Sequence, residues 1–169
     1  MRRVAYARVD SPFGELLAAV TDRGLVRLAF PEERFDNVLE DLADELGGSV
    51  EEAPAKLAQV RRELDMYFSG RRRSFETAVD LSLVAGFSRR VLEATTRIPY
   101  GTVASYGEVA GRAGSPRGAR AAGNALNGNP VPIYVPCHRV ILADGAIGGY
   151  GGHEERKRFL LDLEAHGRR

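Results

Sequence analysis

The sequence is poor in cysteine, which forms the disulfides of extracellular proteins, and it lacks the long apolar runs of membrane proteins. It has one cysteine in 169 residues, so no disulfide can form within the chain, and this favours a reducing compartment. The first residues lack the apolar stretch of a signal peptide, and no later run is long enough to cross a membrane. We therefore expect a cytoplasmic protein that does not associate with membranes.

Histidine is also scarce, and this bears on metal binding. The only histidines, His138, His153 and His166, all lie in the second half of the chain. A structural zinc site takes four cysteine, histidine or carboxylate ligands, most often with several cysteines among them. A single cysteine cannot complete such a set, so we expect no metal and no cofactor.

The chain has little net charge, but its two halves differ in sign. The total of +1 combines 16 acidic and 12 basic residues in positions 1–83 with 7 acidic and 12 basic residues in positions 84–169. A mildly basic second half is compatible with a polyanionic partner. Chance clustering of charges on a solvated surface explains the same counts, so the charge is weak support.

The first half has the pattern of a small sheet with two helices. Short β-prone runs separated by glycine-containing turns predict an antiparallel meander over residues 4–9, 16–20 and 25–30. Helical spacing of apolar residues predicts helices over 34–46 and 55–68. We place a boundary near residues 80–86, which separates an N-terminal α/β domain (1–83) from a C-terminal domain (84–169).

The second half is predicted to be mostly helical, with helices over 87–97 and 154–164. Between them, Ser105 and Glu108 fit a capping box that opens a short helix. Ser115 as N-cap and Pro116 at the first helical position predict the start of another helix. Two short helices joined by a glycine-containing turn suggest a helix-turn-helix, although many such pairs bind nothing.

The single cysteine lies in the stretch Pro136-Cys137-His138-Arg139-Val140. The preceding apolar run, 131–135, is broken by a proline and predicts a buried extended segment. Burial of polar side chains in such a segment costs free energy unless they are hydrogen-bonded or ion-paired, so unpaired ones indicate a functional role. A thiol becomes a good nucleophile when a base or a positive field makes it a thiolate, and His138 and Arg139 can supply these. Because neighbours in an extended segment point to opposite faces, either the chain turns at Cys137 or a water relays the proton.

This stretch resembles the acceptor-cysteine motif of the O6-alkylguanine-DNA alkyltransferases, also called methylated-DNA–protein-cysteine methyltransferases. Two further blocks are similar to family blocks in the same order and spacing: Ile98-Pro99-Tyr100-Gly101-Thr102-Val103-Ala104-Ser105-Tyr106 and Asn129-Pro130-Val131-Pro132-Ile133. Weaker matches are Ser11-Pro12-Phe13-Gly14, Tyr67-Phe68-Ser69-Gly70 and Phe75. The resemblance implies an α+β fold: a small ribonuclease-H-like N-terminal domain with an antiparallel sheet and helices, and a mostly helical C-terminal domain with a helix-turn-helix.

The same resemblance implies a reaction and a partner. An alkyl group would pass directly and irreversibly from O6-alkylguanine, or from O4-alkylthymine, in double-stranded DNA to Cys137, once per molecule. The helix-turn-helix would enter the minor groove and flip the damaged base out of the duplex. We expect a monomer, with cooperative binding on DNA left open.

The resemblance also assigns roles to individual residues. Cys137 is the nucleophile and alkyl acceptor, His138 the water-mediated base, Glu164 the group that orients the imidazole, and Asn129 the bridge between the helix-turn-helix and the Cys137 segment. The residues assigned to DNA or the base are Tyr106, Arg120, Ala121, Tyr150, Gly151 and Arg139. Arg120 would take the place of the flipped nucleotide, and Tyr150 and Gly151 would belong to a glycine-rich pocket wall. Arg139 is expected to pair with nearby acceptors. Without the resemblance, Glu164 is interpreted as a surface carboxylate at a helix end and Asn129 as a turn residue.

Two departures and two alternatives remain. Gly151 stands where some relatives have serine, and Leu92 replaces a tryptophan that is frequent in bacterial relatives. One alternative is a non-catalytic module resembling the alkyltransferase-like proteins, which bind alkylated DNA without repairing it; the presence of Cys137 argues against it. The other is a cysteine hydrolase that uses Cys137, His138 and Asn129.

Overall fold

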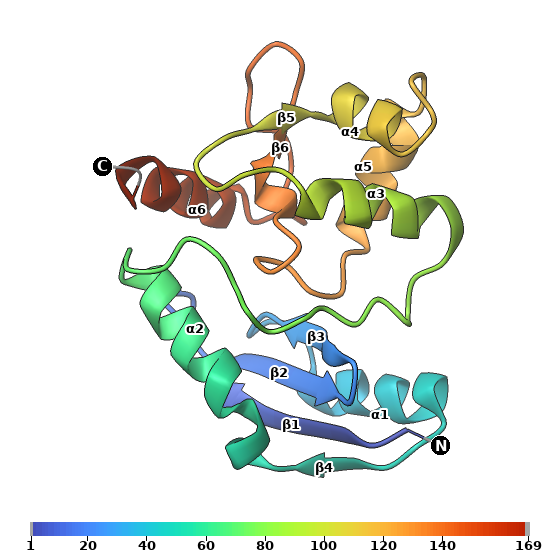
Figure 1. The fold of residues 1–169 in the computed structure, drawn as a ribbon, viewed down its shortest axis with the longest axis vertical. Coiled ribbons are helices and arrows are strands. Elements are labelled where there is room, and N and C mark those ends of the chain that lie inside the picture. The colour runs from blue at the N-terminus through green and yellow to red at the C-terminus, as the bar shows by residue number, and fades with distance from the viewer. Residues whose placement is uncertain (1, 168–169) are drawn as a thin grey trace. The chain divides into compact units, whose positions relative to one another are not determined.

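The computed structural model of the protein describes residues 2–167. The chain folds as two compact units, residues 1–83 and 84–169. The first unit contains a sheet with helices and the second is mainly helical (Figure 1). The α+β class expected from the sequence is therefore confirmed.

The first unit is built on a four-stranded sheet with the order β3-β2-β1-β4. Its strands are β1 (Val4–Val9), β2 (Leu16–Thr21), β3 (Gly24–Ala29) and β4 (Val50–Glu52). The first three strands form the predicted antiparallel meander. β4 runs parallel to β1, so the sheet is mixed and the expectation of a purely antiparallel sheet is wrong. β4 has three residues, of which two are glutamates, and is too short and polar to show strand alternation.

Three helical segments complete this unit: α1 (Phe35–Leu46), the 3-10 turn η1 (Pro54–Leu57) and α2 (Ala58–Phe68). The helix predicted over 34–46 is confirmed, and the one predicted over 55–68 is split into η1 and α2. Gly47 ends α1 in the left-handed conformation at φ 61°, which glycine adopts without steric cost. α1 places Val38 and Leu42 in the same apolar cluster as side chains of β1, β2 and β3.

Residues 69–83, which follow α2, contain no helix and only one isolated bridge, between Leu25 and Val79. Glu63 of α2 is buried and holds the middle of this segment. Its carboxylate accepts hydrogen bonds from the backbone N–H groups of Glu76 (2.6 Å) and Thr77 (3.1 Å). Hydrogen bonds from backbone N–H groups to this buried carboxylate replace the ladder that a strand would otherwise make.

A second buried carboxylate, Asp80, holds the end of the same segment. It accepts hydrogen bonds from the Ser82 N–H group (3.0 Å), from the Thr21 hydroxyl and from the Arg2 guanidinium. Burial alone would raise the pKa of Asp80, but these hydrogen bonds outweigh it and lower the pKa to about 2. Asp80 thus joins the start of β1, the end of β2 and the last residues of the first unit.

The second unit consists of α3 (Gly86–Thr96), β5 (Ala104–Ser105), α4 (Tyr106–Arg112), α5 (Ala119–Asn127), the 3-10 turn η2 (Cys137–Arg139), β6 (Val140–Ile141) and α6 (Glu154–Gly167). β5 and β6 form a short parallel ladder. α3, α4 and α5 pack against one another, and η2 packs against both α3 and α6. The turn that carries the cysteine is therefore supported by two helices.

The two short helices predicted in the middle of this unit are present as α4 and α5. Ser105 and Glu108 form the predicted capping box, in which the Ser105 hydroxyl oxygen accepts from the Glu108 N–H group at 3.1 Å. The predicted start of the next helix at Ser115-Pro116 is wrong. There the Gly118 N–H group donates to the Ser115 carbonyl (2.9 Å), which closes a turn, and α5 begins at Ala119. A Cβ at Gly118 would lie 2.7 Å from the Ser115 hydroxyl oxygen and 3.1 Å from the Ser115 carbonyl oxygen, so a larger residue would crowd this turn.

Candidate active site

Cys137 lies in η2, within a stretch where every residue from 131 to 140 is buried. The prediction of a buried segment is confirmed, but the prediction of an extended one is wrong. The Val135 N–H group donates to the Val131 carbonyl (2.9 Å) and closes a tight turn, with Ile133 at φ 75°. A β-branched residue is strained in this region, and Ile133 is fully buried, so packing must offset the strain. The chain therefore turns immediately before the cysteine.

Asn129, which follows α5, hydrogen-bonds to both ends of this turn and also influences the thiol. Its side-chain amide donates to the Val135 carbonyl (3.0 Å), and its side-chain oxygen accepts from the Val131 N–H group (3.0 Å). Burial raises the pKa of the Cys137 thiol, and the hydrogen bond with Asn129 is the largest influence that lowers it. Asn129 therefore does more than end a helix: it holds the turn before the cysteine and opposes the rise in thiol pKa that burial causes.

His138 is buried and hydrogen-bonded at one ring nitrogen. Its Nε2 lies 2.7 Å from Oε2 of Glu164. Because the ionised carboxylate can only accept, Nε2 carries the hydrogen and Nδ1 has the free lone pair. Burial lowers the pKa of His138, with Glu164 acting in the opposite direction, so the ring is neutral near pH 7. Within residues 2–167, Nδ1 has no hydrogen-bond partner and no hydrogen bond joins His138 to the thiol.

Glu164 lies on the buried side of α6 and is 1% exposed, so the interpretation as a surface carboxylate is wrong. The Arg139 guanidinium donates to both of its oxygens, at 2.8 and 3.0 Å. Burial raises the pKa of Glu164, but the hydrogen bonds from His138 and Arg139 hold it well below its usual range. Arg139 also donates to the Ile98 carbonyl (2.7 Å) and is 7% exposed. Arg139 therefore pairs with acceptors near the site, as expected, and supports Glu164.

Lys157 is a buried cation beside this cluster that the sequence analysis missed. It is 0% exposed, and its Nζ donates to the carbonyls of Val140 (2.6 Å) and Gly149 (3.3 Å) and to the Tyr106 hydroxyl (3.5 Å). Burial lowers its pKa to about 8, against the pull of Cys137. Its positive charge in turn lowers the pKa of the thiol.

Tyr106, the first residue of α4, lies between three elements. A Cβ added at Gly123 of α5 would lie 3.8 Å from its ring, and one added at Gly148 would lie 3.1 Å from its hydroxyl oxygen. Lys157 completes the contact from α6, with Nζ 5.6 Å from the ring centroid. The Tyr106 hydroxyl is therefore held near the cysteine by close packing against two glycines.

The glycine-rich segment predicted as a pocket wall lies between β6 and α6 and has no regular structure apart from turns. Tyr150 has a buried hydroxyl that interacts with the Cys137 thiol; burial first, and then this neighbour, raises the pKa of Tyr150 well above its usual range. Gly151 is exposed at φ 60°. Arg120 and Ala121 are exposed on α5. The structure thus joins Cys137, Asn129, Tyr150, Lys157 and Tyr106 in one cluster, next to the triad His138, Glu164 and Arg139.

Two family descriptions match the two units of the chain. The ribonuclease-like domain of 6-O-methylguanine DNA methyltransferase matches residues 4–81, and the DNA binding domain of the same family matches residues 86–166. The chain is 40% identical to the methylated-DNA–protein-cysteine methyltransferase of Mycolicibacterium paratuberculosis, over 95% of this chain and 92% of that protein. The chain belongs to the 6-O-methylguanine DNA methyltransferase family.

More distant members of the methyltransferase family match over the same length. The constitutive methylated-DNA–protein-cysteine methyltransferase of Bacillus subtilis is 35% identical over 94% of each chain. The crystal structure of Mycobacterium tuberculosis OGT in complex with DNA is 36% identical and has a TM-score of 0.82, covering 98% of this chain and 94% of that one. The fold and the enzyme class expected from the sequence are therefore confirmed.

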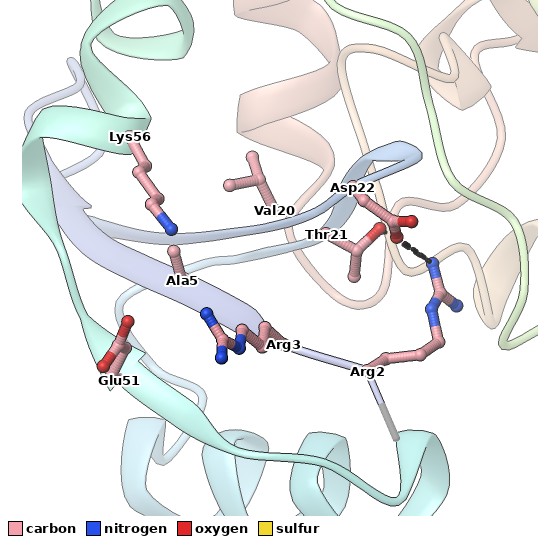
Figure 2. Close-up of a pocket in the computed structure, with 8 residues that line it drawn as sticks. All are labelled: Arg2, Arg3, Ala5, Val20, Thr21, Asp22, Glu51 and Lys56. Atoms are coloured by element: carbon pink, nitrogen blue, oxygen red, sulfur yellow. Dashed lines mark hydrogen bonds and ion pairs between the residues drawn. The ribbon is translucent and has the colours of Figure 1, made fainter.

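The first unit of this methyltransferase-family chain contains a cavity of about 610 Å³. Figure 2 shows the side chains of Arg3 and Lys56 ending near Ala5, and a dashed line marks the ion pair between Arg2 and Asp22. The N–O distance of this ion pair is 3.6 Å. The cavity lining has no cysteine or histidine, so it does not repeat the chemistry around Cys137.

In residues 2–167, no group of three or more His, Cys, Asp or Glu side chains is placed to hold a metal ion. No helix in that range has both the length and the apolar character needed to cross a membrane.

Proposed function

We propose that this chain repairs duplex DNA by transferring the alkyl group of O6-alkylguanine, and of O4-alkylthymine, to the sulfur of Cys137. The observation that carries the proposal is the buried thiol next to a neutral imidazole whose Nε2 is held by a buried carboxylate and whose Nδ1 is uncommitted. A nucleophile, a base and a group that orients the base are the parts that nucleophilic catalysis requires.

The transfer is a displacement at a saturated carbon. The Cys137 proton passes through a water molecule to Nδ1 of His138, and Glu164 stabilises the imidazolium that results. The sulfur then forms a bond to the alkyl carbon as the bond from that carbon to O6 breaks, and the electron pair stays on the guanine. The Tyr106 hydroxyl, supported by Lys157, donates a hydrogen bond to the base as this charge develops.

The reaction ends after one event. The product is a thioether, which is a poor leaving group, and the chain has no second thiol that could accept the alkyl group. We therefore propose a stoichiometric acceptor that is consumed by its reaction. We further propose that the chain acts as a monomer in the cytoplasm, where reducing conditions suit its single free thiol.

Access to the base requires that the damaged nucleotide leave the duplex. We assign this step to α4 and α5, with α5 in the minor groove and Arg120 in the space of the extruded nucleotide. Arg120 is exposed, and its neighbour Ala121 is small enough to allow close approach. Unstacking a base costs a few kcal/mol, which an inserted side chain partly offsets.

Intact-protein mass spectrometry tests the proposal. After incubation with duplex DNA that carries O6-methylguanine, the chain should gain one methyl group, mapped to Cys137, and Cys137→Ser should gain none. With DNA in excess, uptake should stop at one equivalent per chain. A methyl group on another residue, or lesion binding without uptake, would contradict the proposal. Turnover of an activated ester would instead indicate a cysteine hydrolase.

A further inference from the structure

α5 has an outward face whose polar side chains have no partner in the described chain. Its buried residues, Ala122, Ala125 and Leu126, face the core of the second unit. Arg120, Asn124 and Asn127 are exposed on the other side, and none of their side chains makes a hydrogen bond or ion pair within residues 2–167. These three side chains are uncommitted and available to a ligand.

The spacing of these residues forms one stripe along the helix. Positions 120, 124 and 127 are separated by four and three residues, so the three side chains lie on the same side of α5. The exposed residue beside them, Ala121, is small, and α5 contains no acidic residue. This face therefore allows close contact with a polyanion. The side-chain amide of Asn124 lies one helical turn from Arg120 on the same face.

The carboxamide of asparagine is suited to reading the minor groove. It offers two N–H donors and one oxygen acceptor. In the minor groove A·T pairs present only acceptors, whereas a G·C pair adds the donor of the guanine N2 amino group. Only a G·C pair can therefore use both the donors and the acceptor of an asparagine.

We propose that Asn124 gives the repair reaction a preference for a G·C pair near the damaged base, by accepting a hydrogen bond from the guanine N2 amino group. The inference rests on the proposed function, in which Arg120 takes the place of the extruded nucleotide. Asn124 follows Arg120 by four residues, about 6 Å along the helix. Stacked base pairs are about 3.4 Å apart, so with α5 aligned along the duplex axis Asn124 lies against the second base pair from the lesion, on one side of it.

The test varies the amino group alone. Duplexes with O6-methylguanine carry, at the second pair on either side, G·C, inosine·C (which lacks the amino group), A·T or 2,6-diaminopurine·T (which adds it). On one side, the native chain should repair both amino-containing duplexes about three- to tenfold faster than their partners, the effect of one hydrogen bond. In Asn124→Ala this ratio should fall to about one. Each variant is compared on the same DNA, so differences in duplex stability cancel.

Asn127→Ala is the matched control, because it removes the same carboxamide from the same face one turn further on. It should keep the native preference at the second pair. Both variants replace an exposed helical residue by alanine, the best helix former, so folding should be retained.

Equilibrium binding of the same duplexes to chains that also carry Cys137→Ser separates this inference from the proposed function. A preference that is lost in Asn124→Ala supports the role of Asn124 even if no methyl group is transferred. Equal repair or binding with and without the amino group, or an amino-group preference that survives in Asn124→Ala, would overturn the inference.

Discussion

Asp80 in the first unit and Glu164 in the second are buried carboxylates in similar surroundings. They are 4% and 1% exposed, and each pairs with an arginine and accepts further hydrogen bonds. In both, burial alone would raise the pKa, and the hydrogen bonds prevail and lower it. By burial and charge the two clusters are nearly alike.

The difference between them lies in the partners. The other donors to Asp80 are hydroxyls and a backbone N–H group, and none of them titrates near neutral pH. The other donors to Glu164 are the Gly101 N–H group (3.4 Å) and an imidazole whose second nitrogen is a free proton acceptor. In this molecule a depressed carboxylate pKa alone is therefore no sign of a catalytic site; the proposed site differs in having a partner that can transfer a proton onward.

Replacing each carboxylate by its amide should affect the two clusters differently, and it should give the largest change in the rate of alkyl transfer. Glu164→Gln should slow alkyl transfer by about a hundredfold, because His138 loses the partner that fixes its tautomer and stabilises its charged form. It should also lower the free energy of unfolding by about 3 kcal/mol, since Arg139 is left buried and unpaired. Asp80→Asn should lower that free energy by about 2 kcal/mol and leave the rate per folded molecule unchanged.

Single-turnover kinetics and urea unfolding on both variants provide the measurements. If the two substitutions slowed transfer equally, Glu164 would act only through folding. If neither slowed it, the proposed role of His138 as base would be wrong.

The comparison also shows which parts of the fold the sequence could predict. Strands β1 to β3, α1 and the Ser105 capping box were predicted because apolar periodicity and cap residues act locally. A turn at Cys137 was one of two alternatives, but residues 131–135 were predicted as extended because their turn depends on Ile133 at a positive φ, a conformation that isoleucine does not favour. The start of α5 was misplaced because the turn at Gly118 overrides the capping signal of Ser115.

The candidate site was predicted mainly by the family resemblance. Spacing along the sequence does not bring Glu164 to His138, since 26 residues separate them and only packing of α6 against η2 joins them. Lys157 was missed, although a signal was present. It precedes the buried Leu160 and Glu164 by three and seven residues, so it lies on the buried stripe of α6. A lysine on such a stripe indicates a buried and committed cation.

Lys157 sharpens the comparison because it is a buried charge whose hydrogen-bond acceptors include no carboxylate. Lys157→Met should slow alkyl transfer about tenfold at pH 7, since the thiolate loses a stabilising charge of roughly that worth. In the native chain the rate should rise with pH as the thiolate forms, and should level off or fall above about pH 8 as Lys157 loses its proton. In Lys157→Met that upper limb should be absent, and the rate should continue to rise.

Rate–pH profiles of the two chains measure this difference, and Arg158→Met, an exposed neighbour on α6, is the control. Arg158→Met should keep the native profile. An upper limb that persisted in Lys157→Met would assign it to another group.

Gly148 and Gly145 allow a similar comparison for packing in place of charge. Substitution of Gly148 should give the smallest effect on the rate of repair. A Cβ at Gly148 would lie 3.1 Å from the Tyr106 hydroxyl oxygen and 3.3 Å from ring atom Cε2, whereas one at Gly145 would have nothing within 4 Å. Both glycines have positive φ, 77° and 91°, so Gly148→Ala and Gly145→Ala should each cost about 1 kcal/mol of backbone strain. Only Gly148→Ala should displace Tyr106, by a few tenths of an ångström, and slow single-turnover repair about threefold beyond the Gly145→Ala control. If the two variants react at the same rate, the position of the Tyr106 hydroxyl does not limit transfer, and the charge of Lys157 acts on the thiol directly.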